Sequence, residues 1–124
     1  MSLSDADFGA IVADVLERLP AAFRAELDNV LICVDAWPSE AVMEETGARE
    51  PEELFGLYDG IPLTERGNEP ELQPARVHIF REPLRVAFGD DRELLESEVR
   101  QTLLHELGHH FGLTDEQMDS LGIY

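Results

Sequence analysis

The segment from Asp90 to Phe111 constrains the fold of this chain more than any other. Apolar side chains recur in it at every fourth position, at Leu95, Val99, Leu103, Leu107 and Phe111. This spacing places them on one face of an α-helix. Asp90 or Asp91 can cap the first turn, and Gly112 can end the helix in the left-handed conformation. The sequence therefore predicts a helix over 90–111 that buries this stripe in the domain.

Shorter elements are predicted before residue 50. They are an amphipathic helix over 5–19 capped by Ser4, a short helix over 20–27, a strand over 30–34 and a helical turn over 38–45 that Gly47 ends. The run Val30–Val34 is continuously apolar and rich in β-branched residues, which is typical of a buried strand. Cys33 within it is predicted to be a small buried hydrophobe. With one cysteine, the chain has no internal disulfide.

The remaining segments carry loop, strand and helix signals. Residues 54–58 are a weaker strand candidate, and the glycines and prolines between 60 and 75 predict a long loop. Arg76–Arg81 alternates polar and apolar side chains, which predicts a half-buried or edge strand. Residues 83–88 are ambiguous, and Thr114 can cap a final short helix that carries Met118 and Leu121. We therefore predict one α+β domain over residues 1–124, with a small mixed sheet of about three strands against the long helix.

The charge of the chain excludes several classes of partner. The formal net charge is −18, from 27 acidic and 9 basic residues, and all the basic residues are arginine. A surface this acidic repels phosphate groups, which argues against nucleic acids and anionic membrane surfaces as partners. No segment reaches the roughly 20 apolar residues that cross a membrane. The first residues lack the basic and apolar regions of a secretory signal, so we expect a cytoplasmic protein.

Two histidines and a glutamate lie near the end of the long helix, in the sequence His105-Glu106-Leu107-Gly108-His109. Positions i and i+4 differ by about 40° around a helix axis, so the two histidines share a face. Neutral imidazoles at this spacing are good ligands for one zinc ion. Glu106 projects beside the metal, where it suits a general base that acts on a zinc-bound water. The pattern fixes only three of its five positions, so alone it is moderately specific.

The residues after His109 strengthen this prediction. A third ligand six positions later would lie about 240° around the axis if the helix continued. Gly112 allows the chain to leave the helix and turn back, which brings Asp115 toward the metal. Glu116 and Asp119 are alternatives, and a site with only two protein ligands is another. Three protein ligands leave one position for water, an arrangement typical of catalytic rather than structural zinc sites.

These residues resemble a bacterial family of small zincin-like metallopeptidases. The likeness covers Thr102–Asp115 and extends upstream to Leu57–Thr64 and Val77–Arg81. It implies a reduced zincin catalytic domain, with an active-site helix beside a small mixed sheet. It also implies that the two spaced histidines are zinc ligands, that Glu106 is the general base, and that Asp115 is the third ligand where metzincins usually carry histidine.

The sequence thus predicts a zinc-dependent metallopeptidase that binds one Zn²⁺ per chain and hydrolyses peptide bonds. Its partner would be a peptide or protein substrate, which could pair with Arg76–Arg81 if that strand lies at a sheet edge. The alternative is a metal- or peptide-binding module that keeps the zincin fold without turnover. A third hypothesis is a toxin-like or regulatory protein that needs a second, unknown chain to complete its cleft.

Other polar residues are predicted to have structural roles. His110 points about 100° away from the preceding histidine, so we expect a surface or supporting group rather than a ligand. His78 is expected to be packed or exposed without a catalytic role. Tyr58 and Tyr124 could each donate a hydrogen bond to an oxyanion, but nothing in their spacing selects either. Met118 follows the third ligand too closely to form a metzincin methionine turn, so it is predicted to pack in the core.

Overall fold

The computed structural model describes residues 3–67 and 73–123. Its helices are α1 (Asp5–Glu17), α2 (Ala21–Glu26), α3 (Glu40–Thr46), α4 (Arg81–Phe88), α5 (Arg92–His110) and α6 (Asp115–Ser120). Its strands are β1 (Val30–Asp35), β2 (Gly56–Asp59) and β3 (Ala75–Phe80). Single turns of 3₁₀-helix occupy Leu27–Asn29, Pro51–Glu53 and Leu63–Glu65.

The strands form one mixed sheet in the order β1-β3-β2, with β1 parallel to β3 and β2 antiparallel to it. The long helix α5 packs against β2 and β3, which confirms the predicted α+β fold. β3 is half-buried as predicted, but it is the central strand, so the alternative of an edge position for Arg76–Arg81 is wrong. Alternation along a strand reports which face is buried, whereas edge position depends on pairing within the plane of the sheet.

The outer strand β1 is less buried than its apolar sequence predicts. Leu31 and Val34 keep 49% and 37% of their surface exposed, and Cys33 is partly exposed rather than buried. β1 pairs with β3 on one side only, so its other side has no neighbouring strand among the described residues. By contrast, Val77 and Ile79 of the central strand are completely buried. The continuous apolar run therefore marks a strand at the edge of the core, not one covered on both faces.

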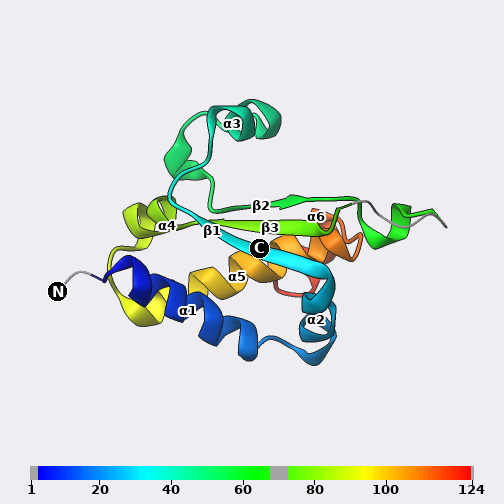
Figure 1. Ribbon diagram of the computed structural model, residues 1–124, viewed down its shortest axis with the longest axis horizontal. Helices are drawn as coiled ribbons and strands as arrows, with labels where there is room; N and C mark the ends of the chain where they lie inside the picture. The colour runs from blue at the N-terminus through cyan, green and yellow to red at the C-terminus, as the bar shows by residue number, and fades with distance from the viewer. Residues whose placement is uncertain (1–2, 68–72, 124) are drawn as a thin grey trace.

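The predicted apolar stripe of α5 lies at the centre of the core. The stripe residues with 0% exposure are Leu95, Val99, Leu103 and Leu107. They share one buried cluster with Phe8 and Ile11 of α1, and Figure 1 shows α1 and α5 on the same side of the sheet. Asp91 caps α5, because its side chain accepts a hydrogen bond from the Leu94 N–H at 3.2 Å. Packing of the stripe fixes the rotation of α5 about its axis and so directs its polar residues.

Most of the other predicted helix boundaries agree with the structure. Ser4 caps α1 by accepting from the Asp7 N–H at 3.0 Å, although α1 ends at Glu17 rather than at Leu19. Gly47 ends α3 with a φ of +74°, as its position after the helical turn predicts. The ambiguous segment 83–88 belongs to α4.

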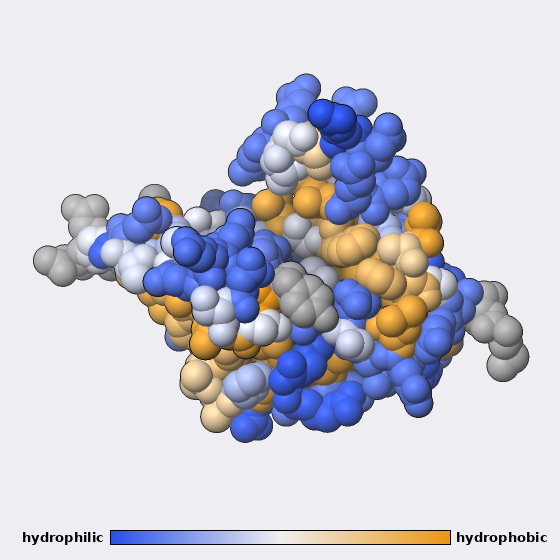
Figure 2. All heavy atoms as spheres, turned by 180° about the vertical axis from the view of Figure 1, so that it is seen from behind, coloured by the Kyte–Doolittle hydropathy of each residue, from blue (hydrophilic) through white to orange (hydrophobic). Residues whose placement is uncertain are grey.

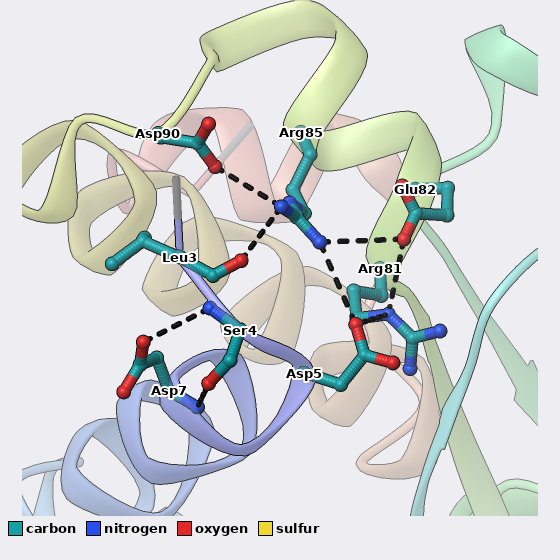
Figure 3. Close-up of polar contacts among 8 residues, drawn as sticks. All are labelled: Leu3, Ser4, Asp5, Asp7, Arg81, Glu82, Arg85 and Asp90. Atoms are coloured by element: carbon teal, nitrogen blue, oxygen red, sulfur yellow. Dashed lines mark hydrogen bonds and ion pairs between the residues drawn. The ribbon is translucent and has the colours of Figure 1, made fainter. Parts of the chain in front are cut away.

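A cluster of charged side chains joins the start of α1 to α4 (Figure 3). The Nε atom of Arg81 lies 3.2 Å from a carboxylate oxygen of Asp5. Arg85 donates to the backbone carbonyl of Leu3 at 2.7 Å and reaches the Asp90 carboxylate at 3.2 Å. Both arginine side chains are less than one-fifth exposed. We call this group the arginine cluster; it ties the N-terminal helix to the residues that precede α5.

The surface follows the acidic composition of the chain. Figure 2 shows hydrophilic residues over most of the lobe that contains α3, with a zone of hydrophobic residues below it. On α3 itself, Glu40, Glu44 and Glu45 are exposed. In residues 3–67 and 73–123, no helix combines the length and the hydropathy needed to cross a membrane.

Candidate metal centre

Helix α5 ends in a tight turn around Gly112. This glycine has a φ of +83°, the left-handed conformation that the sequence predicts. Its N–H donates to the carbonyl of His109 at 2.9 Å, and the N–H of Leu113 donates to the carbonyl of Gly108 at 3.0 Å. These two bonds form a Schellman motif, which satisfies the last carbonyls of the helix and reverses the chain. Asp115, the first residue of α6, is thereby returned toward the end of α5.

Three side chains converge where the chain reverses. The Nε2 atoms of His105 and His109 lie 3.2 Å apart, and a carboxylate oxygen of Asp115 lies 3.5 Å from each of them. Ligand atoms about 2.0 Å from a tetrahedral Zn²⁺ lie about 3.3 Å from one another. The three atoms are thus spaced like three corners of a zinc coordination tetrahedron, so this group could hold a metal ion. The fourth corner would be open.

The surroundings of His105 favour its neutral imidazole, the form that binds metals. Burial lowers the pKa of His105, the neighbouring His109 lowers it further, and Asp115 and Asp119 act in the opposite direction. The Nδ1 atom of His105 is buried without a hydrogen-bond partner among the described residues. The acidic alternatives Glu116 and Asp119 do not belong to the group of converging ligand atoms found there.

Glu106 lies beside this group rather than within it. Its carboxylate is 4.0 Å from the Nε2 atom of His105, and its side chain is 13% exposed. Burial raises the pKa of Glu106 to about 7, which a polar contact with the backbone N–H of Tyr58 partly offsets. A carboxyl group with a pKa near neutrality can accept and return a proton at physiological pH.

Strand β2 passes over α5 at a glycine that the sequence analysis did not single out. A Cβ atom on Gly56 would lie 2.6 Å from Cγ2 of Thr102 and 3.3 Å from Cγ of Glu106. Because Gly56 has no side chain, the backbone of β2 can lie directly against the helix at the position of Glu106. A glycine within a strand candidate is a signal of such close approach, and here it was available in the sequence.

A comparison with known families identifies the family of the chain. A model of the zincin-like metallopeptidase family matches residues 27–123, which span β1 to the residues after α6. The chain belongs to this family. The match includes the end of α5, the turn at Gly112 and the edge strand β2. A search among curated proteins finds no match.

In this zincin-like protein His110 is buried, and its partners are Tyr58 and Glu26. Its side chain is 0% exposed, so the alternative of a surface position is wrong. Its Nε2 atom lies 2.8 Å from a carboxylate oxygen of Glu26, and its Nδ1 atom lies 2.7 Å from the hydroxyl of Tyr58. Both ring nitrogens are therefore engaged away from His105 and His109. Glu26 lies 84 positions away in the sequence, so no local pattern could have identified this partner.

The other histidine and tyrosine candidates have local partners or lie outside the described residues. The Tyr58 hydroxyl also lies 3.2 Å from the carbonyl oxygen of Ile61, so it is held within the domain. The Nδ1 atom of His78 lies 2.8 Å from the Asp35 carboxylate, on the neighbouring strand β1. Tyr124 falls outside the described residues.

An apolar side chain of α6, Met118, packs beneath the end of α5. Met118 is completely buried, as predicted, and a Cβ atom on Gly108 would lie 2.3 Å from its sulfur atom. Gly108 therefore allows α6 to pack closely under the segment that carries both histidines. Thr114 caps α6 as predicted, whereas Leu121 after it remains 65% exposed.

Proposed function

We propose that this chain is a zinc-dependent peptidase with His105, His109 and Asp115 as zinc ligands and Glu106 as general base. The observation that carries the proposal is the spacing of the three ligand atoms, 3.2 to 3.5 Å, beside a buried carboxyl group. Membership of the zincin-like metallopeptidase family supports zinc as the metal and peptides as the class of substrate. Three protein ligands leave a coordination position for a reactant.

The chemistry divides between the metal and the side chains. Zinc, when bound, supplies Lewis acidity that activates water and polarises the carbonyl of the substrate. Glu106 accepts the proton of the attacking water on its carboxylate and returns it to the amine of the leaving group. Its burial serves this role, because a pKa of about 7 allows the carboxyl group to work in both directions near neutral pH.

The outer edge of β2, which has no neighbouring strand in residues 3–67 and 73–123, is the place for an extended peptide. Phe80 N–H donates to the Phe55 carbonyl at 2.9 Å, and bonded pairs alternate along an antiparallel ladder. By that alternation the backbone groups of Gly56 and Tyr58 point away from β3, toward the outer side of β2. Since the Tyr58 N–H is directed at Glu106, a substrate strand can pair with the backbone groups of Gly56 and the carbonyl of Tyr58 on this edge. This replaces the pairing with Arg76–Arg81, because that segment lies in the centre of the sheet.

The net charge gives this proposal a direction for substrate preference. A chain with a formal charge of −18 attracts cationic peptides over long range, and the attraction weakens as salt is added. We expect lysine- and arginine-rich peptides to be cleaved with higher kcat/KM than acidic ones of the same length. The difference should shrink between low and physiological ionic strength.

Elemental analysis and digestion of a peptide library test the function together. The native protein should carry about one zinc per chain and cleave peptides. Glu106→Gln should keep the zinc while hydrolysis falls by about 10²- to 10⁴-fold, because glutamine cannot accept the proton. Glu93→Gln, an exposed position in the first turn of the same helix, is the matched control and should behave as native.

Other outcomes would separate the alternatives. Loss of zinc in Glu106→Gln would make Glu106 a ligand and contradict its assignment as base. Zinc without cleavage in the native protein, across the whole library, would favour a metal- or peptide-binding module with a zincin fold.

A further inference from the structure

Four polar side chains near the end of α5 form two interleaved pairs, each with i, i+4 spacing. His105 and His109 are spaced i, i+4 and face the candidate metal centre. Glu106 and His110 have the same spacing, one position later, so they share a neighbouring face about 100° around the helix. The first pair belongs to the site already described. The second pair has one partner in common, which is Tyr58 of β2.

Tyr58 is held by the second pair at two different points. Its backbone N–H is a hydrogen-bond donor toward the carboxylate of Glu106, and on the same strand a Cβ atom at Gly56 would lie 3.3 Å from Cγ of Glu106. Its hydroxyl lies 2.7 Å from Nδ1 of His110, and the two rings are 5.5 Å apart. A residue held through both its backbone and the end of its side chain cannot shift along the helix without breaking one of these contacts. Tyr58 therefore fixes how β2 lies over the last turn of α5.

The His110 ring that contacts the Tyr58 hydroxyl is itself held by Glu26 on its other side. A carboxylate only accepts hydrogen bonds, so the Nε2 atom of His110 carries the hydrogen that points to Glu26 at 2.8 Å. This bond fixes the orientation of the imidazole, whose side chain is completely buried. The Tyr58 hydroxyl has further neighbours in the carbonyl of Ile61 and the side chain of Arg66. Buried networks in which each member is satisfied hold their members rigidly.

We propose that His110 and Glu26 are positioning residues for Glu106. Through the hydroxyl of Tyr58 they hold the Tyr58 backbone N–H against the Glu106 carboxylate, and this contact orients the general base toward the metal centre. They contact neither metal nor substrate, so they act only through Tyr58. The inference rests on the function proposed above for Glu106, and it adds a role for three residues that the metal centre does not explain.

The network can be cut without a large change in shape. Tyr58→Phe removes only the hydroxyl, and Glu26→Leu removes the acceptor of the His110 N–H, whereas Glu26→Gln keeps an acceptor there. Val12→Ala is the control, because it removes buried volume in α1, remote in sequence from the network, and lowers the Tm comparably. For each protein we would measure zinc Kd, kcat and KM on a peptide that the native protein cleaves, and hydrogen exchange of the Tyr58 amide.

Positioning predicts a specific split among these quantities. Tyr58→Phe and Glu26→Leu should lower kcat about tenfold, with KM and zinc Kd within about twofold of native, because a misaligned base slows chemistry without removing binding groups. Exchange of the Tyr58 amide should accelerate in both variants, and Glu26→Gln should recover most of the lost kcat. Val12→Ala should keep the native kcat well below its Tm.

The opposite results would overturn the proposal. If Tyr58→Phe keeps the kcat of Val12→Ala, the network only stabilises the fold. A native protein that cleaves no peptide would refute the proposed function, and the positioning would then be judged on exchange alone. In that case an unchanged Tyr58 amide in Tyr58→Phe and Glu26→Leu would refute the network as well.

Discussion

Carboxylates lie at both the start and the end of α5, but their partners differ. Before the start, Arg81 and Arg85 of the arginine cluster contact the carboxylates of Asp5 and Asp90 (Figure 3). At the end, two imidazoles converge with the carboxylate of Asp115, and no arginine of the described residues pairs with it. The first region supplies its own cations, whereas the second presents candidate metal ligands without an arginine partner among the described residues.

The arginine cluster can stabilise the fold without a ligand, whereas the group at the end of α5 would gain a partner only from a bound ion. An ion pair closed within the chain contributes to stability without a ligand from solution, by an amount that falls as salt is added. A group of donors without a cation gains its interaction energy only when an ion binds. Substitutions in the first region should therefore change stability alone, and substitutions in the second should change metal binding.

The largest expected effect is the loss of the metal from His105→Ala. Loss of partners behind a metal ligand already costs about 10- to 100-fold in affinity, so removal of a ligand should cost more than about 100-fold. Isothermal titration with Zn²⁺ and elemental analysis would measure it, with Arg85→Ala as the control that keeps its zinc. Equal zinc contents in the native and His105→Ala proteins would contradict the assignment of His105 as a ligand, and with it the proposed metal centre.

Glu106 should make the metal-free protein less stable as the pH rises. Its pKa is raised from 4.5 to about 7 in the folded state, so the folded protein binds more protons than the unfolded chain between these values. Stability is thus fully retained below pH 4.5 and declines toward pH 7. Glu106→Gln should remove this decline and stabilise the protein at pH 8 by on the order of 3 kcal/mol.

Urea unfolding of both proteins with a chelator present, at pH 4.5 and pH 8, would measure this effect. The two proteins should have nearly the same free energy of unfolding at pH 4.5, where the carboxyl group is mostly protonated in the folded state. A constant difference between them at both pH values would mean that Glu106 is not the titrating group.

Gly112→Ala should lower both the stability of the fold and the affinity for zinc. A left-handed φ costs a residue with a Cβ about 1–2 kcal/mol, and the new Cβ would lie 2.3 Å from the hydroxyl oxygen of Thr64. Gly47→Ala is the matched control, because it has a similar φ of +74° and nothing within 4 Å. Both variants should lose stability in denaturant, but only Gly112→Ala should also bind zinc about tenfold more weakly, since it displaces Asp115. Equal zinc affinities would show that the turn does not place the ligand.

Arg85→Ala should have the smallest effect. It tests whether the arginine cluster contributes to stability without affecting zinc binding. It removes one hydrogen bond to the Leu3 carbonyl and ion pairs with exposed or partly exposed carboxylates, so the free energy of unfolding should fall by about 1 kcal/mol. Zinc affinity and peptide cleavage should stay at native values. Reduced zinc affinity in this variant would mean that the two regions communicate through α5.

The sequence predicted well what depends on residues close together in the chain. The four-residue spacing of Leu95, Val99, Leu103 and Leu107 determines which face of α5 is buried, and Gly112 determines where the helix ends. These features follow from helix geometry and from the freedom of glycine at positive φ. The convergence of Asp115 with the histidines follows from the same turn and was expected on those grounds.

What the sequence did not predict depends on partners far apart in the chain. The central position of β3 depends on pairing with both β1 and β2, which alternation within one strand does not report. The burial of His110 depends on Glu26, which the fold brings to it from α2. The i, i+4 spacing of Glu106 and His110 could be read from the sequence. Their common partner, Tyr58, could not, because it lies on a strand that only the fold brings to α5.

The turn at Gly112 would also link the binding of a cation to the closing of the last turn of α5. His105 and His109 precede the turn and Asp115 follows it, so an ion held by all three would close a small ring across the helix end. Helix ends normally open first, and their amide hydrogens exchange fastest. A bound cation would reverse that order by linkage, since it binds only the closed form. The exchange rates of the Gly112 and Leu113 amides would then report how full the site is, without any substrate.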